Sequence, residues 1–183
     1  MENFTFYAPT YFSFGDGSER QCGALVRRFG GTKGLLHYGG GSVRRNGGLD
    51  KVVASLTDAG IPYVELGGVQ PNPRSGLVYE GIGLCRREGI DFILAVGGGS
   101  TIDSAKAIAA GVPYDGDFWD YYGTGKPVDT APPVGPGLTL AAAGSGGSPG
   151  SGITHAEGGR KGGAPGAARP PRFSLPNPTV TCT

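Results

Sequence analysis

The feature that most constrains the fold is the four-residue sequence GGGS, which occurs twice in the same setting. The chain reads LLHYGGGSVRR over residues 35–45 and ILAVGGGSTID over residues 93–103. In both places a short apolar run, typical of a buried strand, precedes the glycines, and a segment with helical spacing follows them. Two strand–turn–helix units of this kind predict right-handed crossovers and a doubly wound parallel sheet.

The hydrophobic periodicity of the other segments fits this fold. An aromatic-rich stretch at residues 4–14 predicts an N-terminal pair of strands, and a capping-box pattern from Ser18 to Gln21 predicts the start of a helix. The segment 114–123 suits a surface element packed by its own aromatic rings. Together the patterns predict an α/β, Rossmann-like parallel sheet with flanking helices. Further strands are expected at residues 34–38, 62–66, 90–96 and 137–143, and further helices at residues 47–60 and 75–88 and around Ile102, Ala105, Ile108 and Ala109.

Glycine content divides the chain in two. Glycine makes up 37 of the 183 residues and 12 of the 32 residues between Gly135 and Gly166, whereas roughly 7% is usual. We therefore assign residues 1–143 to an α/β domain and residues 144–183 to a Gly/Pro-rich, degenerate remainder of that domain, with coil or poorly ordered backbone. Glycines in this remainder are expected to remove side chains from the core, at a cost of several kcal/mol in total.

The charge and cysteine content exclude several classes of protein. Lysine plus arginine number 16 and aspartate plus glutamate 15, so we expect no nucleic-acid partner and no binding to an anionic membrane surface. The sequence has no apolar run of about 18 residues and no leader-like start, which predicts neither a membrane span nor a signal peptide. Cys22, Cys85 and Cys182 lie far apart and form no C-x-x-C motif, so free thiols in a reducing cytoplasm are expected.

The two glycine turns have the chemistry of a phosphate site. In an open parallel sheet, ligands bind at the carboxyl ends of the strands. Glycines there let a ligand approach the backbone, and the helix that follows offers free N–H groups to phosphate oxygens. Ser42 and Ser100 are placed either to cap their helices or to donate to phosphate, and Arg44 and Arg45 add positive charge. Asp103 has two alternative roles, closing a capping box with Ser100 or facing the ligand.

The segment GIDFILAVGGGSTIDSAKAIAAGVPYDGD, residues 89–117, resembles the iron-dependent alcohol dehydrogenases, and within that family the NADPH-dependent butanol dehydrogenases. The similarity is dense over residues 1–113 and includes FGDGSE, LLHYGGGSVRR, PNPR and LVYEGIGLCRREGIDF. It implies that residues 1–143 form an α/β domain that binds NAD(P), and that a helical domain binding iron or zinc follows in the family. The resemblance weakens after residue 136.

The resemblance also implies a set of coenzyme-binding residues. The second glycine turn would hold the pyrophosphate and the first would surround the adenosine ribose. Asp103 would lie on the nicotinamide side, Lys161 would meet the nicotinamide ribose, and Asn72 would lie near the adenosine end. The implied residues are Gly39, Gly40, Gly41, Ser42, Asn72, Gly97, Gly98, Gly99, Ser100, Asp103, Thr139, Leu140 and Lys161.

The first turn bears on the choice of coenzyme. An acidic residue there would accept a hydrogen bond from a free ribose 2′-hydroxyl and would repel a 2′-phosphate. The turn has none, and Arg44 and Arg45 follow it. This pattern favours NADP(H) over NAD(H).

No metal ligand and no catalytic residue can be assigned. The family's ligands are an aspartate and three histidines, and the first pair is spaced D-x-x-x-H. This chain holds only His37 and His155, with Lys33 and Ser151 four residues before them. Two isolated histidines do not build such a site. We expect that the chain stops where the helical metal domain would begin.

The resulting expectation is an NADP(H)-dependent oxidoreductase of small alcohols and aldehydes, of which this chain is the coenzyme-binding portion and is inactive alone. Three alternatives stay open: a non-catalytic nucleotide-binding fragment, a relative similar to glycerol dehydrogenase or dehydroquinate synthase, and a chain that does not fold stably. The segments PNPR and CRREGIDFILAVGGGS favour the first interpretation over the sister enzymes. The resemblance also implies a homodimer formed through the stretch 4–14.

Overall fold

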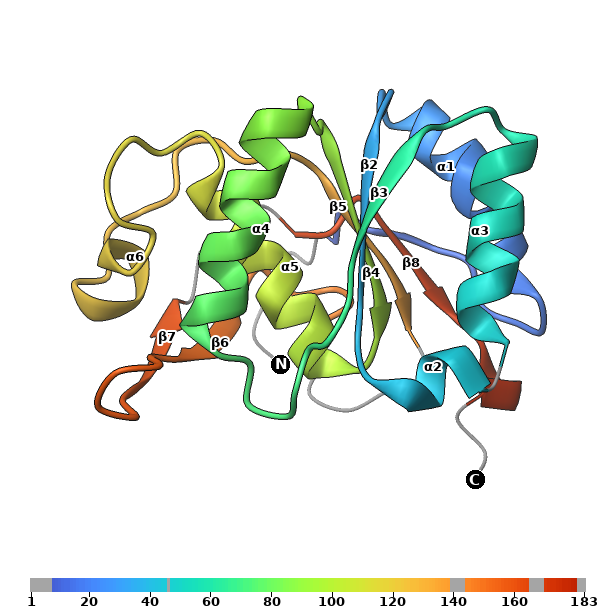
Figure 1. Cartoon of the computed structure of the whole chain (residues 1–183). Helices are drawn as coiled ribbons and strands as arrows, with labels where there is room; N and C mark the ends of the chain where they lie inside the picture. Colours follow the sequence, from blue (N-terminus) through green and yellow to red (C-terminus); the bar gives the residue numbers. More distant parts are fainter. Residues whose placement is uncertain (1–7, 46, 139–143, 165–169, 181–183) are drawn as a thin grey trace, which may run out of the picture.

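The computed structural model describes residues 8–45, 47–138, 144–164 and 170–180, and these form an α/β fold (Figure 1). The strands are β1 (Tyr11–Phe12), β2 (Gly34–Tyr38), β3 (Tyr63–Leu66), β4 (Phe92–Gly97), β5 (Val134–Leu138), β6 (Ser151–Thr154), β7 (Lys161–Ala164) and β8 (Phe173–Pro176). The helices are α1 (Cys22–Arg28), α2 (Gly41–Arg45), α3 (Gly48–Asp58), α4 (Ser75–Glu88), α5 (Gly99–Gly111) and α6 (Asp120–Gly123), with 3-10 turns η1 (Ser18–Gln21) and η2 (Pro178–Val180).

Among the described strands, six form one parallel sheet in the order β1-β8-β5-β4-β2-β3. β2 and β4 pair along their length, with Leu35 opposite Ile93 and Tyr38 opposite Val96. β6 and β7 form a separate antiparallel hairpin. The predicted Rossmann-like parallel sheet is confirmed.

Helices cover both faces of the central strands. Leu35 and Ile93 belong to a core shared with α4 and α5, while Leu36 and Leu94 belong to a second core shared with α1 and α3. In Figure 1 these two helix pairs lie on opposite sides of the sheet. The apolar runs of β2 and β4 lack polar alternation because neither face of these strands meets water.

The helix expected over residues 75–88 is confirmed as α4. Val78, Ile82 and Cys85 are buried, whereas Leu77 and Leu84 are only partly buried. Gly81 lies where α4 approaches α5, because a Cβ there would be 2.4 Å from Ile108 Cδ1. The face of α4 that carries Val78, Ile82 and Cys85 therefore packs on the core.

The helix expected from Ser18 begins as the 3-10 turn η1 and continues as α1. Its capping box is wrong: Gly17 precedes η1 without a side-chain cap. Ser18 Oγ donates to the Pro176 carbonyl at 3.3 Å, and Gln21 Nε2 donates to Ser13 Oγ at 2.9 Å. These tertiary contacts use the two side chains that the pattern had assigned to the helix end.

The aromatic segment 114–123 is not a surface element alone. Phe118, Tyr121 and Tyr122 are buried in the core next to α4 and α5. The Phe118 ring meets the Tyr79 ring edge-on with centroids 4.7 Å apart. The rings do pack on one another, as expected, but they also extend the core.

The glycine-rich remainder contains regular structure, which corrects the expected coil. β6, β7 and β8 all lie in it. The strand expected at residues 137–143 is β5 and begins at Val134; residues 139–143 lie outside the described part. The first residues of β5 were missed because Pro136 and its flanking glycines are residue types that do not favour strands.

Some glycines of this region lie where neighbouring side chains already fill the space. A Cβ on Gly162 would be 2.9 Å from Tyr122 Cβ. A Cβ on Gly146 would be 2.8 Å from Ser174 Oγ. The expected loss of core packing is therefore wrong at these positions, because larger residues there would overpack the core.

At the N-terminal end, β1 pairs in parallel with β8, with Tyr11 opposite Phe173. Residues 1–7, which hold the rest of the predicted strand pair, lie outside the described part. Tyr11, Phe12 and Phe14 are 37%, 53% and 74% exposed. The described part of the aromatic stretch is thus a sheet edge with solvent-facing rings.

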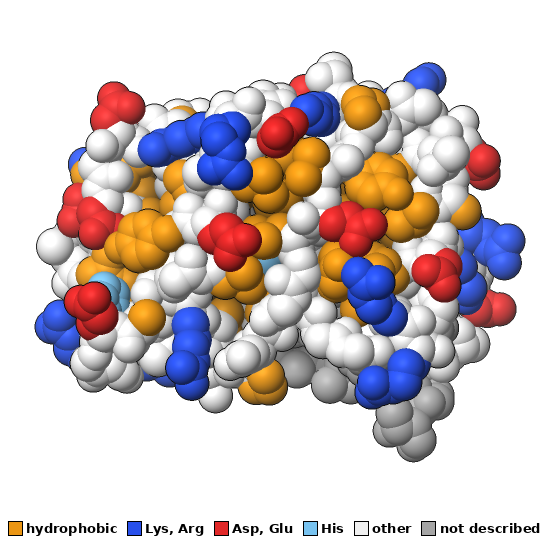
Figure 2. Space-filling model, viewed as in Figure 1, with side chains coloured by type: hydrophobic (Ala, Val, Ile, Leu, Met, Phe, Trp, Pro, Cys, Tyr) orange, Lys and Arg blue, Asp and Glu red, His pale blue; other side chains and the backbone are white. Residues whose placement is uncertain are grey.

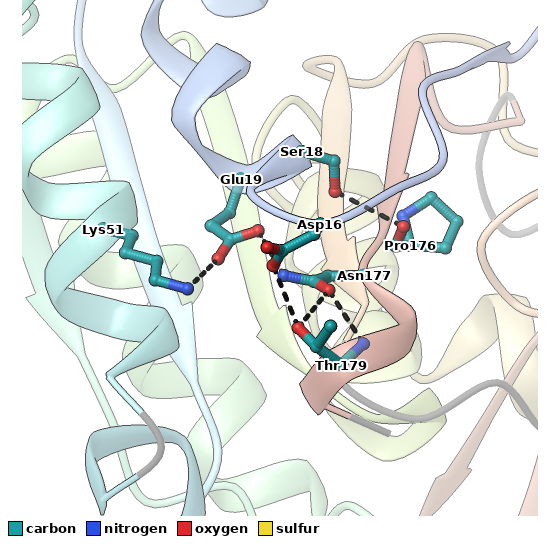
Figure 3. A network of polar contacts seen from close by, with 7 residues as sticks. All are labelled: Asp16, Ser18, Glu19, Lys51, Pro176, Asn177 and Thr179. Carbon is teal, nitrogen blue, oxygen red and sulfur yellow. Dashed lines mark hydrogen bonds and ion pairs between the residues drawn. The ribbon is translucent and has the colours of Figure 1, made fainter. Parts of the chain in front are cut away.

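A polar network joins the N-terminal part of the chain to the segment after β8 (Figure 3). Glu19 is buried in η1; one of its oxygens accepts from Asn177 Nδ2 at 2.8 Å and the other forms an ion pair of 2.8 Å with Lys51 of α3. Thr179 Oγ1 donates to Asp16 at 3.1 Å. Despite the cost of burial, the Lys51 and Asn177 contacts leave the pKa of Glu19 below its usual value.

Surface charges are mixed. Lys and Arg side chains are interspersed with Asp and Glu side chains on the face seen in Figure 2. Across the described ranges, none of the helices combines the length and apolarity that crossing a bilayer requires.

Candidate functional site

The two glycine turns lie side by side at the carboxyl edge of the sheet. Tyr38 and Val96, the residues directly before the turns, are paired across β2 and β4. The Gly39 N–H donates to the Val96 carbonyl at 3.4 Å, which ties one turn to the other strand. The structure therefore brings together the two glycine groups, Gly39–Ser42 and Gly97–Ser100, that the sequence had singled out.

The glycines in these turns differ in what surrounds them. A Cβ on Gly40 or Gly98 would meet no atom within 4 Å, so a ligand can reach the backbone there. A Cβ on Gly99 would lie 3.5 Å from Ser145 Oγ. Gly97 is different: its φ is +156° and its Cβ would be 2.5 Å from Thr101 Oγ1, so glycine is needed there for packing.

The second turn leads into α5, a 13-residue helix whose N-cap is Gly98 and has no side-chain cap. The N–H groups of Thr101 and Ile102 donate to the Gly98 carbonyl at 3.0 and 3.2 Å, and the N–H groups before them have no partner within the helix. The capping box between Ser100 and Asp103 is therefore wrong, because Ser100 lies inside the helix. Asp103 Oδ2 instead accepts from the Gly152 N–H at 3.1 Å.

Asp103 and Lys106 connect α5 to the β6–β7 hairpin. The Asp103 Oδ1 atom is buried, and the Ser145 side chain lies near enough to hydrogen-bond to this carboxyl. Burial raises the pKa of Asp103, while the Gly152 N–H and the Lys106 ammonium act in the opposite direction. Lys106 is fully buried and donates to the Gly150 carbonyl at 2.8 Å; burial lowers the pKa of its ammonium to about 8.

The hairpin carries Lys161 to the same edge of the sheet. Lys161 Nζ donates to Asn72 Oδ1 at 3.1 Å. Its positive charge also acts to lower the pKa of Asp103. Asn72, in the loop between β3 and α4, has φ +55° and is the non-glycine residue with positive φ in the described ranges.

Beside the first turn lies a cluster that the sequence analysis missed. Arg44, on α2, is hydrogen-bonded to the Tyr38 hydroxyl, which donates to Glu65 Oε2 at 2.9 Å. Arg44 Nη2 and Glu65 Oε2 form an ion pair of 3.4 Å. The turn itself has no acidic residue, as the sequence shows, but β3 supplies one. The sequence feature that could have revealed Glu65 is its position near the carboxyl end of β3, the edge where ligands bind in such sheets.

Neither histidine is arranged as a metal ligand. His37 is buried within β2, where Nδ1 donates to the Leu66 carbonyl at 2.8 Å and Nε2 lies 2.9 Å from Ser104 Oγ. Burial lowers the pKa of His37 to about 4. His155 packs on Trp119 with ring centroids 4.6 Å apart. Within the described ranges, no three His, Cys, Asp or Glu residues gather in a way that could hold a metal ion.

The structure thus gathers most of the predicted site residues at one edge. The two turns, Asp103, and the Lys161–Asn72 pair all lie there. Thr139 and Leu140 lie outside the described residues. Gly152 and Ser145, which adjoin Asp103 and Gly99, were not predicted because the glycine-rich sequence around them has no period.

The sheet order, the covering helices and the paired turns define a Rossmann-like α/β protein whose ligand edge is the carboxyl edge of the sheet. The family model described as iron-containing alcohol dehydrogenase matches residues 9–178. The chain belongs to the iron-containing alcohol dehydrogenase family.

Individual relatives agree with this assignment. The chain is 50% identical to the probable NADH-dependent butanol dehydrogenase 2 of Bacillus subtilis over 183 residues, all of this chain and 47% of that protein. It is 37% identical to the NADPH-dependent aldehyde reductase YqhD of Escherichia coli over 186 residues, again all of this chain and 47% of the relative. The crystal structure of NADH-dependent butanol dehydrogenase A from Thermotoga maritima superposes with a TM-score of 0.94 at 40% identity, over 98% of this chain and 45% of that one. The chain spans about half the length of the curated relatives it matches.

The family name implies a metal, and the described residues do not fit one. Both histidines are engaged in other contacts, and Asp103 has no second protein ligand beside it that would complete a site. We therefore derive no chemical step through a metal from the described residues.

Proposed function

We propose that this chain binds NAD(P)H across the two glycine turns at the carboxyl edge of its sheet. The observation that supports this proposal is the pairing of Tyr38 with Val96, which places the two turns after neighbouring strands. A dinucleotide has two halves joined by a pyrophosphate, and two adjacent turns suit its length. The open space beside Gly40 and Gly98 supports a close approach of the ligand to the backbone.

Each proposed contact follows from the local chemistry. The pyrophosphate would accept hydrogen bonds from the first turn of α5, next to Gly98 and Gly99. Lys161 and Asp103 would lie on the nicotinamide side, where their opposite charges balance. Gly39–Ser42 would contact the adenosine half, whereas Asn72, hydrogen-bonded to Lys161, would lie with it on the nicotinamide side rather than at the adenosine end that the resemblance implied. Thr139 and Leu140 remain candidates on the resemblance alone.

We keep NADP(H) as the proposed preference, since Arg44 and Arg45 follow the first turn and would attract a 2′-phosphate. The relatives divide on this point. Those from Bacillus subtilis and Clostridium acetobutylicum are named NADH-dependent, and the one from Escherichia coli is named NADPH-dependent. The acidic Glu65 beside Arg44 works against the preference.

The reaction we propose is the interconversion of a small alcohol and its aldehyde, of the kind named for the butanol dehydrogenases. This chain would bind the coenzyme and orient it. A non-catalytic nucleotide-binding module is the second candidate, supported by the absence of a metal-ligand group from the described ranges. We expect the chain alone to show no turnover with butanol and NADP⁺ or NAD⁺.

We also propose a homodimer and a reducing compartment. The exposed Phe12 and Phe14 beside β1 support a homodimer formed through the N-terminal stretch. The free, buried Cys22 and Cys85 support a reducing compartment such as the cytoplasm.

Titration of the 183-residue chain with NADPH and with NADH tests the proposal. Fluorescence from Trp119 and from the reduced nicotinamide should change and saturate. An unchanged signal up to millimolar coenzyme would contradict binding. Metal-dependent oxidation of butanol by the purified chain would contradict the expected lack of turnover.

A further inference from the structure

Arg44 is held beside the first glycine turn by two side chains from different strands. Its guanidinium lies over the Tyr38 ring, 5.0 Å from the centroid, and is hydrogen-bonded to the Tyr38 hydroxyl. Glu65 Oε2 accepts from that hydroxyl at 2.9 Å and lies 3.4 Å from Arg44 Nη2. Tyr38 ends β2 and Glu65 is the penultimate residue of β3, so the sheet register places the acid here.

This arrangement puts opposite charges at the adenosine end of the proposed site. Arg44 and Arg45 attract a 2′-phosphate, which carries close to two negative charges. Glu65 cancels part of that attraction. It also holds the Arg44 guanidinium against Tyr38, so the guanidinium is less free to move toward a ligand. A neutral 2′-hydroxyl is affected far less by the same carboxylate.

The geometry points to Glu65 as a residue that sets the discrimination between NADPH and NADH, by pairing with Arg44 and so weakening the binding of a 2′-phosphate. The inference rests on the proposed coenzyme site and goes beyond it, because it assigns the selectivity to an acid on β3 rather than to the glycine turn. It predicts that removing the Glu65 charge strengthens NADPH binding selectively.

Glu65→Gln is a clean substitution for this purpose. The amide has the same shape and still accepts a hydrogen bond from the Tyr38 hydroxyl. The Glu65 side chain is 42% exposed, and exposed ion pairs contribute little to stability, so the variant should fold normally.

The chain offers a matched control in Glu88→Gln. The Glu88 side chain is also 42% exposed and forms an ion pair of 2.9 Å with Lys33. Lys33 directly precedes β2, so this pair lies at the opposite, amino edge of the sheet. The control removes the same charge from the whole molecule without changing the field at the first turn.

The test measures dissociation constants of NADPH and NADH for the wild-type chain, Glu65→Gln, Glu88→Gln, Arg44→Gln and the Glu65→Gln/Arg44→Gln double variant. Glu65→Gln should tighten NADPH binding roughly three- to tenfold at low salt, and NADH binding by no more than about twofold. Glu88→Gln should leave the ratio of the NADPH and NADH dissociation constants unchanged. The gain in NADPH affinity should disappear when Arg44→Gln is also present. The affinity for 2′,5′-ADP, measured by competition, should change across the variants in the same way as the affinity for NADPH.

A Glu65→Gln ratio equal to that of Glu88→Gln would overturn the inference. A loss of NADH binding without a gain for NADPH would also overturn it, because Glu65 would then be accepting directly from the ribose. Failure of the wild-type chain to bind either coenzyme would overturn the proposed function and this inference with it. Binding of both coenzymes with an unmoved ratio overturns this inference alone.

Discussion

Lys161 Nζ lies 3.1 Å from Asn72 Oδ1, although 89 residues separate the two in the chain. The contact is one of several between the β6–β7 hairpin and the loop before α4. Thr154 N–H donates to the Pro73 carbonyl at 2.8 Å, and the Ala156 N–H donates to Ser75 Oγ at 2.9 Å. The hairpin is thereby fixed against the loop, and Lys161 is positioned at the carboxyl edge of the sheet.

If Lys161 contacts the coenzyme, Lys161→Met should weaken coenzyme binding about tenfold, since one charge-assisted hydrogen bond is lost. Stability should change little, because the side chain is exposed. Lys126→Met is the control: that ammonium lies 4.2 Å from the Tyr114 ring centroid, away from the turns. Equal affinities of the two variants in a fluorescence titration would rule out the assigned role.

Gly97 and Gly98 are adjacent, and their alanine variants should fail in different ways. Gly97→Ala places a Cβ 2.5 Å from Thr101 Oγ1, which should lower the free energy of unfolding by about 1–3 kcal/mol. Gly98→Ala meets no atom within 4 Å, and its φ of −84° suits alanine. We expect it to keep wild-type stability within about 0.5 kcal/mol and to bind coenzyme more weakly, because the methyl group occupies ligand space. Thermal melts and titrations of both variants check this; Gly98→Ala with wild-type affinity would contradict it.

Lys106 should give the chain an unusual dependence of stability on pH. Its folded pKa is lowered by burial to about 8, whereas the unfolded chain titrates near its ordinary value. Between these values the unfolded state holds more protons, so the free energy of unfolding contributed by Lys106 rises with pH above about 8. Relative to Lys106→Met, the wild type should gain on the order of 2 kcal/mol between pH 8 and pH 10.

Urea denaturation of both proteins across this pH range measures the difference. The comparison cancels the titration of tyrosines, which both proteins share. A stability difference that stays constant with pH would mean that burial does not lower the folded pKa of Lys106.

The Glu19 network of Figure 3 predicts a second dependence of stability on pH, in acid. The pKa of Glu19 is lowered in the folded state, so its contribution is present above its unfolded pKa and is lost as the pH falls through the folded value. Glu19→Gln should cost about 1–3 kcal/mol at pH 7, since the partly exposed Lys51 loses the buried carboxylate with which it pairs.

The difference between Glu19→Gln and the wild type should shrink below about pH 4, as the wild-type carboxyl becomes protonated. Asp16→Asn provides the comparison, because Asp16 is exposed and accepts one bond from Thr179. A Glu19→Gln variant as stable as Asp16→Asn at pH 7 would contradict the importance of the buried pair.

Sequence patterns predicted the centre of the sheet well because the strands there have a clear hydrophobic pattern of their own. β2 and β4 are continuous apolar runs followed by glycine, and both are buried on two faces. The pairing of the two turns follows directly from that pattern. Asn72 and Lys161 came from the resemblance rather than from periodicity, and their mutual contact emerged only in three dimensions.

The glycine-rich remainder could not be predicted from its own sequence. β6 and β7 have few side chains that could show a period of two, and Ile153 and Ala164 alone enter the core. These strands exist because α5 and α6 supply the packing and Asp103 supplies a hydrogen bond to Gly152. Tertiary context therefore overrides weak local propensity. Glu65 was missed for a related reason: its role depends on a strand pairing that places it beside Tyr38.

The sheet order has a consequence for how the protein is made. β8 is the last described strand to leave the ribosome, yet it lies between β1 and β5. β1 must therefore wait without its partner until β8 has been synthesised, with Phe12 and its edge exposed. Contacts between segments so distant in the chain form slowly, so the nascent chain should depend on protection from aggregation until β8 inserts.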